Sequence, residues 1–127
     1  MNRVLLFLLL VFFTSCQDTP FVQGKRLYKA YCSNCHMNDG SGLSLLIPAI
    51  SSSKITYGAS FICLMYHGKS DTIFEKSTYL VKEMPSFKHL SSTEITNIIN
   101  YINHTWHHPF KEKTIKNTTE ELSDCLD

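Results

Sequence analysis

The sequence predicts an all-α fold of three to four helices joined by long loops, and three observations lead to that prediction. A strongly periodic apolar segment follows a helix-start signal near residue 91. A second segment, over residues 22–35, repeats its apolar side chains in the same three- and four-residue steps. The chain shows no convincing alternation of apolar and polar residues, which is the pattern of strands. With 127 residues it can form one domain and little more.

The first 15 residues have the features of a signal peptide. Arg3 precedes an unbroken apolar run over residues 4–13, and ten helical residues span only about half of a roughly 30 Å hydrocarbon core. The run ends in Phe-Thr-Ser-Cys, which resembles a bacterial lipobox, in which the cysteine is lipidated. An ordinary signal peptide with an incidental Cys16 is the alternative. We expect residues 1–15 to be removed, and Cys16 to anchor the exported chain to the periplasmic side of the inner or the outer membrane.

The folded domain is expected at residues 22–106. Residues 16–21 are a tether that reaches about 20 Å when fully extended, so the domain stays close to its membrane. The helix predicted over residues 22–35 places Gly24 and Tyr28 on its apolar face and its basic residues on the other.

The middle of the chain is predicted to be mostly loop. The residues after His36 are rich in Asn, Asp, Gly and Ser, which favour turns. A short, apolar and therefore buried helix is expected over residues 59–67, ended by Gly68 as a left-handed residue. Residues 69–83 mix polar and apolar side chains, and we expect them to be irregular.

The clearest helix is predicted over residues 92–105. The stretch Ser91-Ser-Thr-Glu94 is a capping box. The apolar residues that follow it have helical spacing: Ile95, Ile98, Ile99, Ile102 and Trp106. We expect residues 107–127 to form a polar C-terminal tail, with one or two helical turns within residues 118–125.

The net charge excludes some classes of partner. There are 12 Lys and Arg against 11 Asp and Glu, so no basic excess indicates nucleic acid. Removal of residues 1–15 takes away one Arg and leaves the mature chain balanced. No Ser/His/Asp set or paired carboxylates indicate catalysis on a small-molecule substrate, so we do not expect an enzyme.

Residues 32–36 read Cys-Ser-Asn-Cys-His, which is the spacing that attaches a c-type haem. Cys32 and Cys35 can each form a thioether to one porphyrin vinyl group, and His36 then lies beneath the iron as an axial ligand. A zinc site would need a further pair of Cys or His ligands, and a thioredoxin-like Cys-x-x-Cys would need a βαβ pattern. The motif therefore predicts one covalent haem c, which would complete the small core of these helices.

The remaining cysteines are Cys63 and Cys125. An oxidising periplasm permits a disulfide between them, but connectivity cannot be deduced from sequence, and Cys63 also suits an apolar core. Both alternatives stay open.

Met84 is the candidate for the second axial ligand. It precedes Pro85 in a loop before the last helix, and a thioether ligand raises the reduction potential relative to a second imidazole. Core packing is the alternative role for Met84. Bis-histidine alternatives exist in the chain, with His89 first among them: His67, His89, His104, His107 and His108.

With its haem motif and its Met-Pro before the last helix, the chain resembles a monohaem class I cytochrome c over about residues 22–106. The resemblance implies a cytochrome c-like fold in which Gly24 and Tyr28 face Ile98 and Tyr101 where the first and last helices cross. It also implies that the Pro48 carbonyl accepts the His36 N–H. Tyr79 corresponds, more weakly, to a family tyrosine near the haem edge.

The resemblance implies an electron carrier. Its partners would be redox proteins at the same membrane, such as a quinol-oxidising complex and a terminal oxidase or reductase. The alternative is a cytochrome subunit of a larger dehydrogenase or reductase complex.

Overall fold

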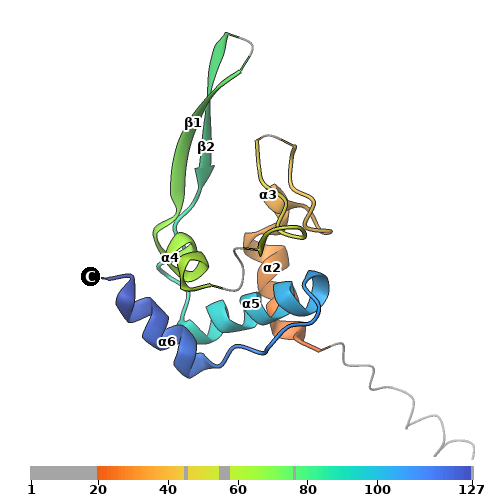
Figure 1. The fold of residues 1–127 in the computed structure, drawn as a ribbon, viewed down its shortest axis with the longest axis vertical. Coiled ribbons are helices and arrows are strands. Elements are labelled where there is room, and N and C mark those ends of the chain that lie inside the picture. The colour runs from red at the N-terminus through yellow and green to blue at the C-terminus, as the bar shows by residue number, and fades with distance from the viewer. Residues whose placement is uncertain (1–19, 45, 55–57, 76, 127) are drawn as a thin grey trace, which may run out of the picture.

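The computed structural model describes residues 20–44, 46–54, 58–75 and 77–126. Within these ranges, five helices and one β-hairpin follow in the order α2, α3, α4, β1, β2, α5 and α6 (Figure 1). The predicted signal peptide and residues 16–19 of the tether, Cys16 included, lie outside the described residues. None of the helices in these ranges is long and apolar enough to cross a membrane.

The fold is mainly helical, but the all-α prediction is wrong for one segment. Lys69–Glu75 (β1) and Thr78–Met84 (β2), which were predicted to be irregular, form an antiparallel hairpin that pairs Lys69 with Met84. The hairpin projects away from the helices (Figure 1). Its strands contain β-branched and aromatic residues, which favour strands. Most of its described side chains are exposed, so the hairpin has no buried face. Its sequence therefore lacks the alternation of apolar and polar residues that indicates a strand.

The helix predicted over residues 22–35 is divided at the haem motif. Val22–Tyr31 forms α2 and Ser33–His36 forms the short α3. Cys32 between them has φ −115° and ψ −37°, and its N–H still donates to the Tyr28 carbonyl at 2.9 Å. The chain therefore turns at Cys32 without losing its helical hydrogen bonding.

Gly24 lies where α2 crosses α5, which spans Ser92–Trp106. A Cβ on Gly24 would lie 2.6 Å from the Tyr101 Cβ and closer still to the Asn97 carbonyl, so only glycine fits here. The Tyr28 ring packs 5.5 Å from the Tyr101 ring. Tyr101 is thus the expected neighbour, whereas Asn97 takes the place at Gly24 that the resemblance assigns to Ile98.

The capping box at the start of α5 is present as predicted. The Glu94 N–H donates to Ser91 Oγ at 3.3 Å, and the Ser91 N–H donates to Glu94 Oε2 at 2.8 Å. The apolar face that follows is almost completely buried: Ile95, Ile98, Ile99 and Ile102. This face of α5 forms one side of the hydrophobic core.

Two further helices complete the fold. Ala59–His67 forms α4 with Phe61, Ile62 and Met65 buried, and Gly68 ends it at φ 74°, with an extended ψ in place of the left-handed one expected. Ile115–Asp124 forms α6, which is longer than the one or two turns predicted for the tail. It packs against α4 and α5, so the predicted tail belongs to the fold (Figure 1). A disulfide joins Cys63 to Cys125.

Candidate functional site

The haem motif occupies one tight turn between α2 and α3. The N–H groups of Cys35 and His36 donate to the Cys32 carbonyl at 3.2 and 2.8 Å. Cys32 and Cys35 are both free thiols, and Cys32 is buried whereas Cys35 is exposed. The structure thus brings the two predicted attachment cysteines and His36 together on one turn.

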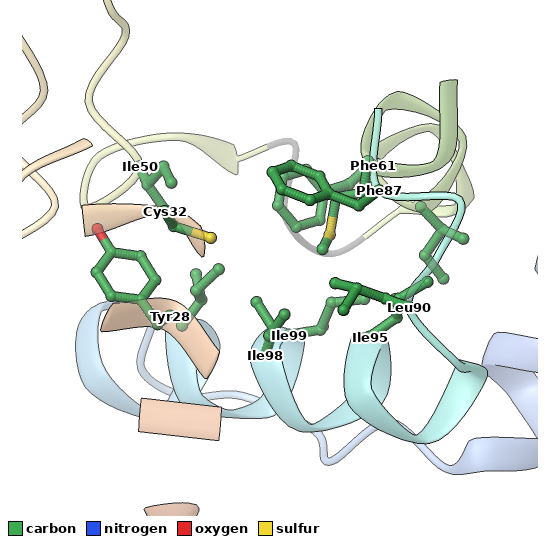
Figure 2. Close-up of a cluster of buried hydrophobic side chains, with 12 residues drawn as sticks. Tyr28, Cys32, Ile50, Phe61, Phe87, Leu90, Ile95, Ile98 and Ile99 are labelled. Atoms are coloured by element: carbon green, nitrogen blue, oxygen red, sulfur yellow. The ribbon is translucent and has the colours of Figure 1, made fainter. Parts of the chain in front are cut away.

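The Cys32 thiol points into the centre of the hydrophobic core (Figure 2). Burial, and after it the nearby Cys35, raises the pKa of this thiol to about 12, so it is neutral at physiological pH. Across the cluster from Cys32 lie Phe61 and Phe87, above Ile98 and Ile99 of α5 (Figure 2). A flat apolar macrocycle attached at Cys32 would therefore meet apolar side chains, which fits a porphyrin.

His36 is held by the loop that follows it. Its Nδ1 lies 3.0 Å from the Pro48 carbonyl oxygen. Because a carbonyl only accepts hydrogen bonds, Nδ1 carries the proton and the Nε2 lone pair is available to a metal. This is the contact that the family resemblance implies for Pro48.

The environment of His36 favours the neutral ring that metals bind. Burial lowers the pKa of His36 below its ordinary value, and the hydrogen bond to Pro48 acts in the opposite direction. A neutral imidazole with a fixed tautomer needs no deprotonation before it coordinates iron.

The backbone conformations of Gly42 and Met37 shape this loop. Gly42 has φ 68°, and a Cβ there would lie 2.7 Å from the Pro48 carbonyl oxygen and closer still to that of Ile47. Met37 has φ 64° and ψ 162°, a conformation that is nearly restricted to glycine. The Tyr28 hydroxyl donates to the Met37 carbonyl at 2.8 Å.

Two thioethers are candidates for the opposite side of the iron. Met84, the last residue of β2, is half-buried and packs against the core cluster. Met65 of α4 is 1% exposed and lies within that cluster. The structure thus places the predicted ligand Met84 beside the same apolar core that Cys32 faces, and it adds Met65 as a second thioether there.

Most of the alternative histidine ligands have other partners. His67 Nε2 donates to the Cys125 carbonyl at 2.8 Å, and His107 Nε2 donates to the Ile50 carbonyl at 3.1 Å. His104 and His108 pack together with the Phe110 ring. His89 is exposed, with its ring 5.5 Å from that of Tyr31. His67, His89 and His108 are exposed, whereas Met84 packs against the core cluster that contains Cys32, and this difference favours Met84 over a second imidazole.

Tyr79 does not lie near the haem motif. It stands on the projecting hairpin, 74% exposed, with its ring 4.9 Å from that of Phe74. The described contacts of Tyr79 therefore give no support to its weak family correspondence, because the hairpin carries this residue away from the core.

Within the described ranges, no three side chains of His, Cys, Asp or Glu come together as a metal-binding group. The zinc alternative for Cys32 and Cys35 therefore gains no support from the fold. An attached haem would instead take one protein ligand from each side of its plane, which is a different requirement.

Comparison with known proteins identifies related sequences. The family model described as "Cytochrome C oxidase, cbb3-type, subunit III" matches residues 20–102. Two curated proteins are 26% identical over 95 residues, and both are named "Alcohol dehydrogenase (quinone), cytochrome c subunit". They come from Gluconacetobacter polyoxogenes and Komagataeibacter europaeus. The match covers 70% of this chain but only 20% of each relative, so the chain corresponds to about one fifth of their length.

Proposed function

This chain belongs to that family of cytochrome c domains, and from that premise we propose that it carries electrons through a single haem c held between His36 and Met84. A cytochrome c is an electron carrier, so the protein needs no acid, base or nucleophile of its own. Haem, when bound, supplies the one-electron couple between Fe(III) and Fe(II). The side chains of the protein attach and orient the haem and set its reduction potential.

The hydrogen bond between His36 and Pro48 is the observation that carries this proposal. At 3.0 Å it fixes the ring and its tautomer, and it makes Nε2 a stronger donor. Cys32 and Cys35 precede His36 on the same turn, so two thioethers and one iron ligand come from five consecutive residues. The buried face of α5 then provides an apolar wall that excludes water from the haem.

Met84 supplies the second ligand in this proposal. It ends β2 and is followed by Pro85, which fixes φ and stiffens the segment. A thioether stabilises Fe(II) relative to a second imidazole and so raises the reduction potential. With His36 and Met84 both holding the iron, no position would be left open for a substrate, which suits electron transfer.

A second candidate is a cytochrome subunit of a larger oxidoreductase complex. The printed names of the two relatives support it, because each is the cytochrome c subunit of a quinone alcohol dehydrogenase. The structure also has apolar side chains at the surface beyond the core: Phe74, Tyr79, Val81, Ile115 and Leu126 are 48–74% exposed. Size-exclusion chromatography of detergent-solubilised native membranes separates the two candidates, since a free carrier elutes without other proteins and a subunit elutes with its complex.

The localisation of the protein is a separate proposal, which rests on the lipobox-like sequence that ends at Cys16. We propose that Cys16 is lipidated after export and holds the domain at the periplasmic side of a membrane, beside redox partners such as a quinol-oxidising complex and a terminal oxidase or reductase. Cys16→Ser should move the protein from the membrane fraction to the soluble periplasmic fraction. An unchanged distribution between the fractions contradicts the anchor.

Covalent attachment is tested by haem staining after denaturing electrophoresis. The double variant Cys32→Ala with Cys35→Ala should lose the stain, because no thioether can form. The control is Ser33→Ala, in the same turn, whose hydroxyl donates only to the Lys29 carbonyl on an exposed surface; it should keep the stain. Stain that persists in the double variant contradicts the proposed function.

A further inference from the structure

The backbone around Met84 is attached to the end of α4. The Phe87 N–H donates to the Met65 carbonyl at 2.9 Å, and the Ser86 hydroxyl donates to the Tyr66 carbonyl at 2.8 Å. Gly68 approaches so closely that a Cβ on it would lie 2.8 Å from the Ser86 nitrogen. The position of residues 84–87 therefore follows the position of α4.

Side-chain packing alone does not fix this segment. A hollow of about 240 Å³ adjoins it, and its lining includes His67, Met84 and Ser86. Phe87 is buried in the core and Met84 packs against it, and the hydrogen bonds to α4 add to the constraint that this packing provides. The attachment of α4 to the rest of the fold thus contributes to the position of Met84.

Two links one helical turn apart hold α4 to the end of α6. The first is the disulfide between Cys63 and Cys125, with their Cα atoms 5.3 Å apart. The second is the 2.8 Å hydrogen bond from His67 Nε2 to the carbonyl of the same Cys125. Residues 63 and 67 lie on one face of α4 because they are four positions apart. Both links fix the same face of α4 to one point on α6.

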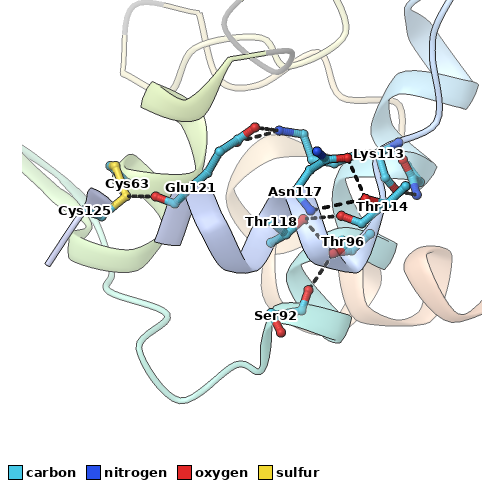
Figure 3. A network of polar contacts seen from close by, with 10 residues as sticks. Cys63, Ser92, Thr96, Lys113, Thr114, Asn117, Thr118, Glu121 and Cys125 are labelled. Atoms are coloured by element: carbon cyan, nitrogen blue, oxygen red, sulfur yellow. Dashed lines mark hydrogen bonds and ion pairs between the residues drawn. A yellow bond between two sulfur atoms is a disulfide. The ribbon is translucent and has the colours of Figure 1, made fainter. Parts of the chain in front are cut away.

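Helix α6 is in turn fixed to α5 by buried polar contacts (Figure 3). Thr96 Oγ1 donates to Thr118 Oγ1 at 2.7 Å, and both residues are at most 4% exposed. Asn100 forms two hydrogen bonds with the backbone of Lys113, at 2.8 and 2.9 Å. Lys113 Nζ also pairs with the Glu121 carboxylate at 2.6 Å, largely away from solvent. These contacts give α6 a defined place on α5.

The contacts form a continuous path between the two sides of the proposed iron site. His36 follows α2, α2 crosses α5 at Gly24, α5 holds α6, and α6 holds α4 through the disulfide. We infer that the Cys63–Cys125 disulfide and His67 are positioning residues for Met84: they fix α4, and α4 fixes the segment that presents the thioether. This inference rests on the proposed function, in which Met84 binds the iron.

The test compares the haem-loaded full chain with its Cys63→Ser/Cys125→Ser variant. Cys32 and Cys35 are thioethers in that protein, so the substitutions leave haem attachment intact. Three quantities are measured below the unfolding temperature: the charge-transfer band of methionine-ligated Fe(III), the reduction potential and hydrogen exchange of the Phe87 amide. We expect a weaker band, a lower potential and roughly tenfold faster exchange, because the segment opens more often.

Two further variants serve as controls. Arg26→Gly, at an exposed position of α2, lies on the His36 side of this path and outside α4 and α6, so it should lower stability and leave exchange of the Phe87 amide unchanged. His67→Ala keeps the disulfide but removes the second link, and it should accelerate exchange of the Phe87 amide to a smaller extent. If the double cysteine variant fails to fold, this variant still tests the inference.

The outcomes separate this inference from the proposed function. A lower melting temperature with an unchanged band, potential and Phe87 exchange would show that the disulfide serves stability alone, and it would overturn the inference. If neither Cys63→Ser/Cys125→Ser nor His67→Ala changes the three quantities, and the band disappears in Met84→Leu, the inference is overturned. The assignment of Met84 as the iron ligand then still holds. A band that persists in Met84→Leu contradicts the proposed function itself.

Discussion

Gly42→Ala offers a quantitative test of how the loop orients His36. Gly42 has φ 68°, and a Cβ there would lie 2.7 Å from the Pro48 carbonyl oxygen, which accepts the His36 N–H. The left-handed conformation costs a residue with a Cβ about 1–2 kcal/mol. Displacing the carbonyl weakens a hydrogen bond whose net contribution is about 1 kcal/mol. We therefore expect the free energy of unfolding to fall by about 2–3 kcal/mol.

The same substitution should change the reduction potential in a known direction. His36 becomes a weaker donor when its N–H loses the Pro48 carbonyl, and a weaker donor stabilises Fe(III) less. The potential should therefore rise. Chemical denaturation gives the stability, and redox titration followed by absorbance gives the potential.

Gly58→Ala is the matched control for this experiment. A Cβ on Gly58 meets only Ser60 Oγ at 3.4 Å, which is an ordinary contact, and its φ of −98° suits any residue. We expect a change of at most several tenths of a kcal/mol, from the poorer helix cap, and an unchanged potential. If Gly42→Ala behaves like Gly58→Ala in both measurements, the reasoning about the Pro48 carbonyl is refuted.

Two further substitutions test local energetics. Met37→Gly should stabilise the chain by about 1 kcal/mol, because Met37 has a backbone conformation nearly restricted to glycine; lower stability in denaturation would contradict this. Ser91→Ala should cost about 1 kcal/mol through loss of the α5 cap, and an unchanged denaturation midpoint would argue against it. Hydrogen bonds from Ser91 hold the pKa of Glu94 below its ordinary value, so its contribution is present above the unfolded pKa and is lost as pH falls through the lowered one. Glu94→Gln should flatten that part of the stability profile.

The parts of the fold that could be predicted from sequence are those whose cause is local. The capping box and the isoleucines of α5 lie within a few turns of each other, so periodicity located this helix to within one residue at its end. Gly68 marked the end of α4 because a positive φ there favours glycine. The turn that presents Cys32, Cys35 and His36 is encoded in five consecutive residues.

The remaining features depend on distant parts of the chain. The disulfide joins residues 62 positions apart, and nothing near Cys63 identifies Cys125 as its partner. Helix α6 is stabilised by Thr118 against Thr96 and by Lys113 against Asn100, which are tertiary contacts of polar residues. A polar composition therefore indicated a tail where the structure has a packed helix.

The hairpin was missed for a different reason. Val81 is 68% exposed and Phe74 is 64% exposed, and the register places them on one face, beside Thr72 and Tyr79 respectively. Apolar side chains normally indicate the buried face of a strand, but here they lie on an exposed face. Their positions therefore did not reveal the strands. The hairpin also carries Tyr79 away from the core, so the structure adds no support to a family correspondence that rests on spacing alone.

The proposal that Met84 is the second iron ligand can be tested by removing one thioether at a time. Met84 and Met65 both lie against the core that Cys32 faces, so Met84→Leu and Met65→Leu form a matched pair of thioether deletions. The absorbance spectrum of Fe(III) and a redox titration are recorded for each. We expect Met84→Leu to lose the methionine–iron charge-transfer band and to have a lower potential, whereas Met65→Leu should keep the band. A band that survives Met84→Leu, or that disappears in Met65→Leu instead, would contradict the account.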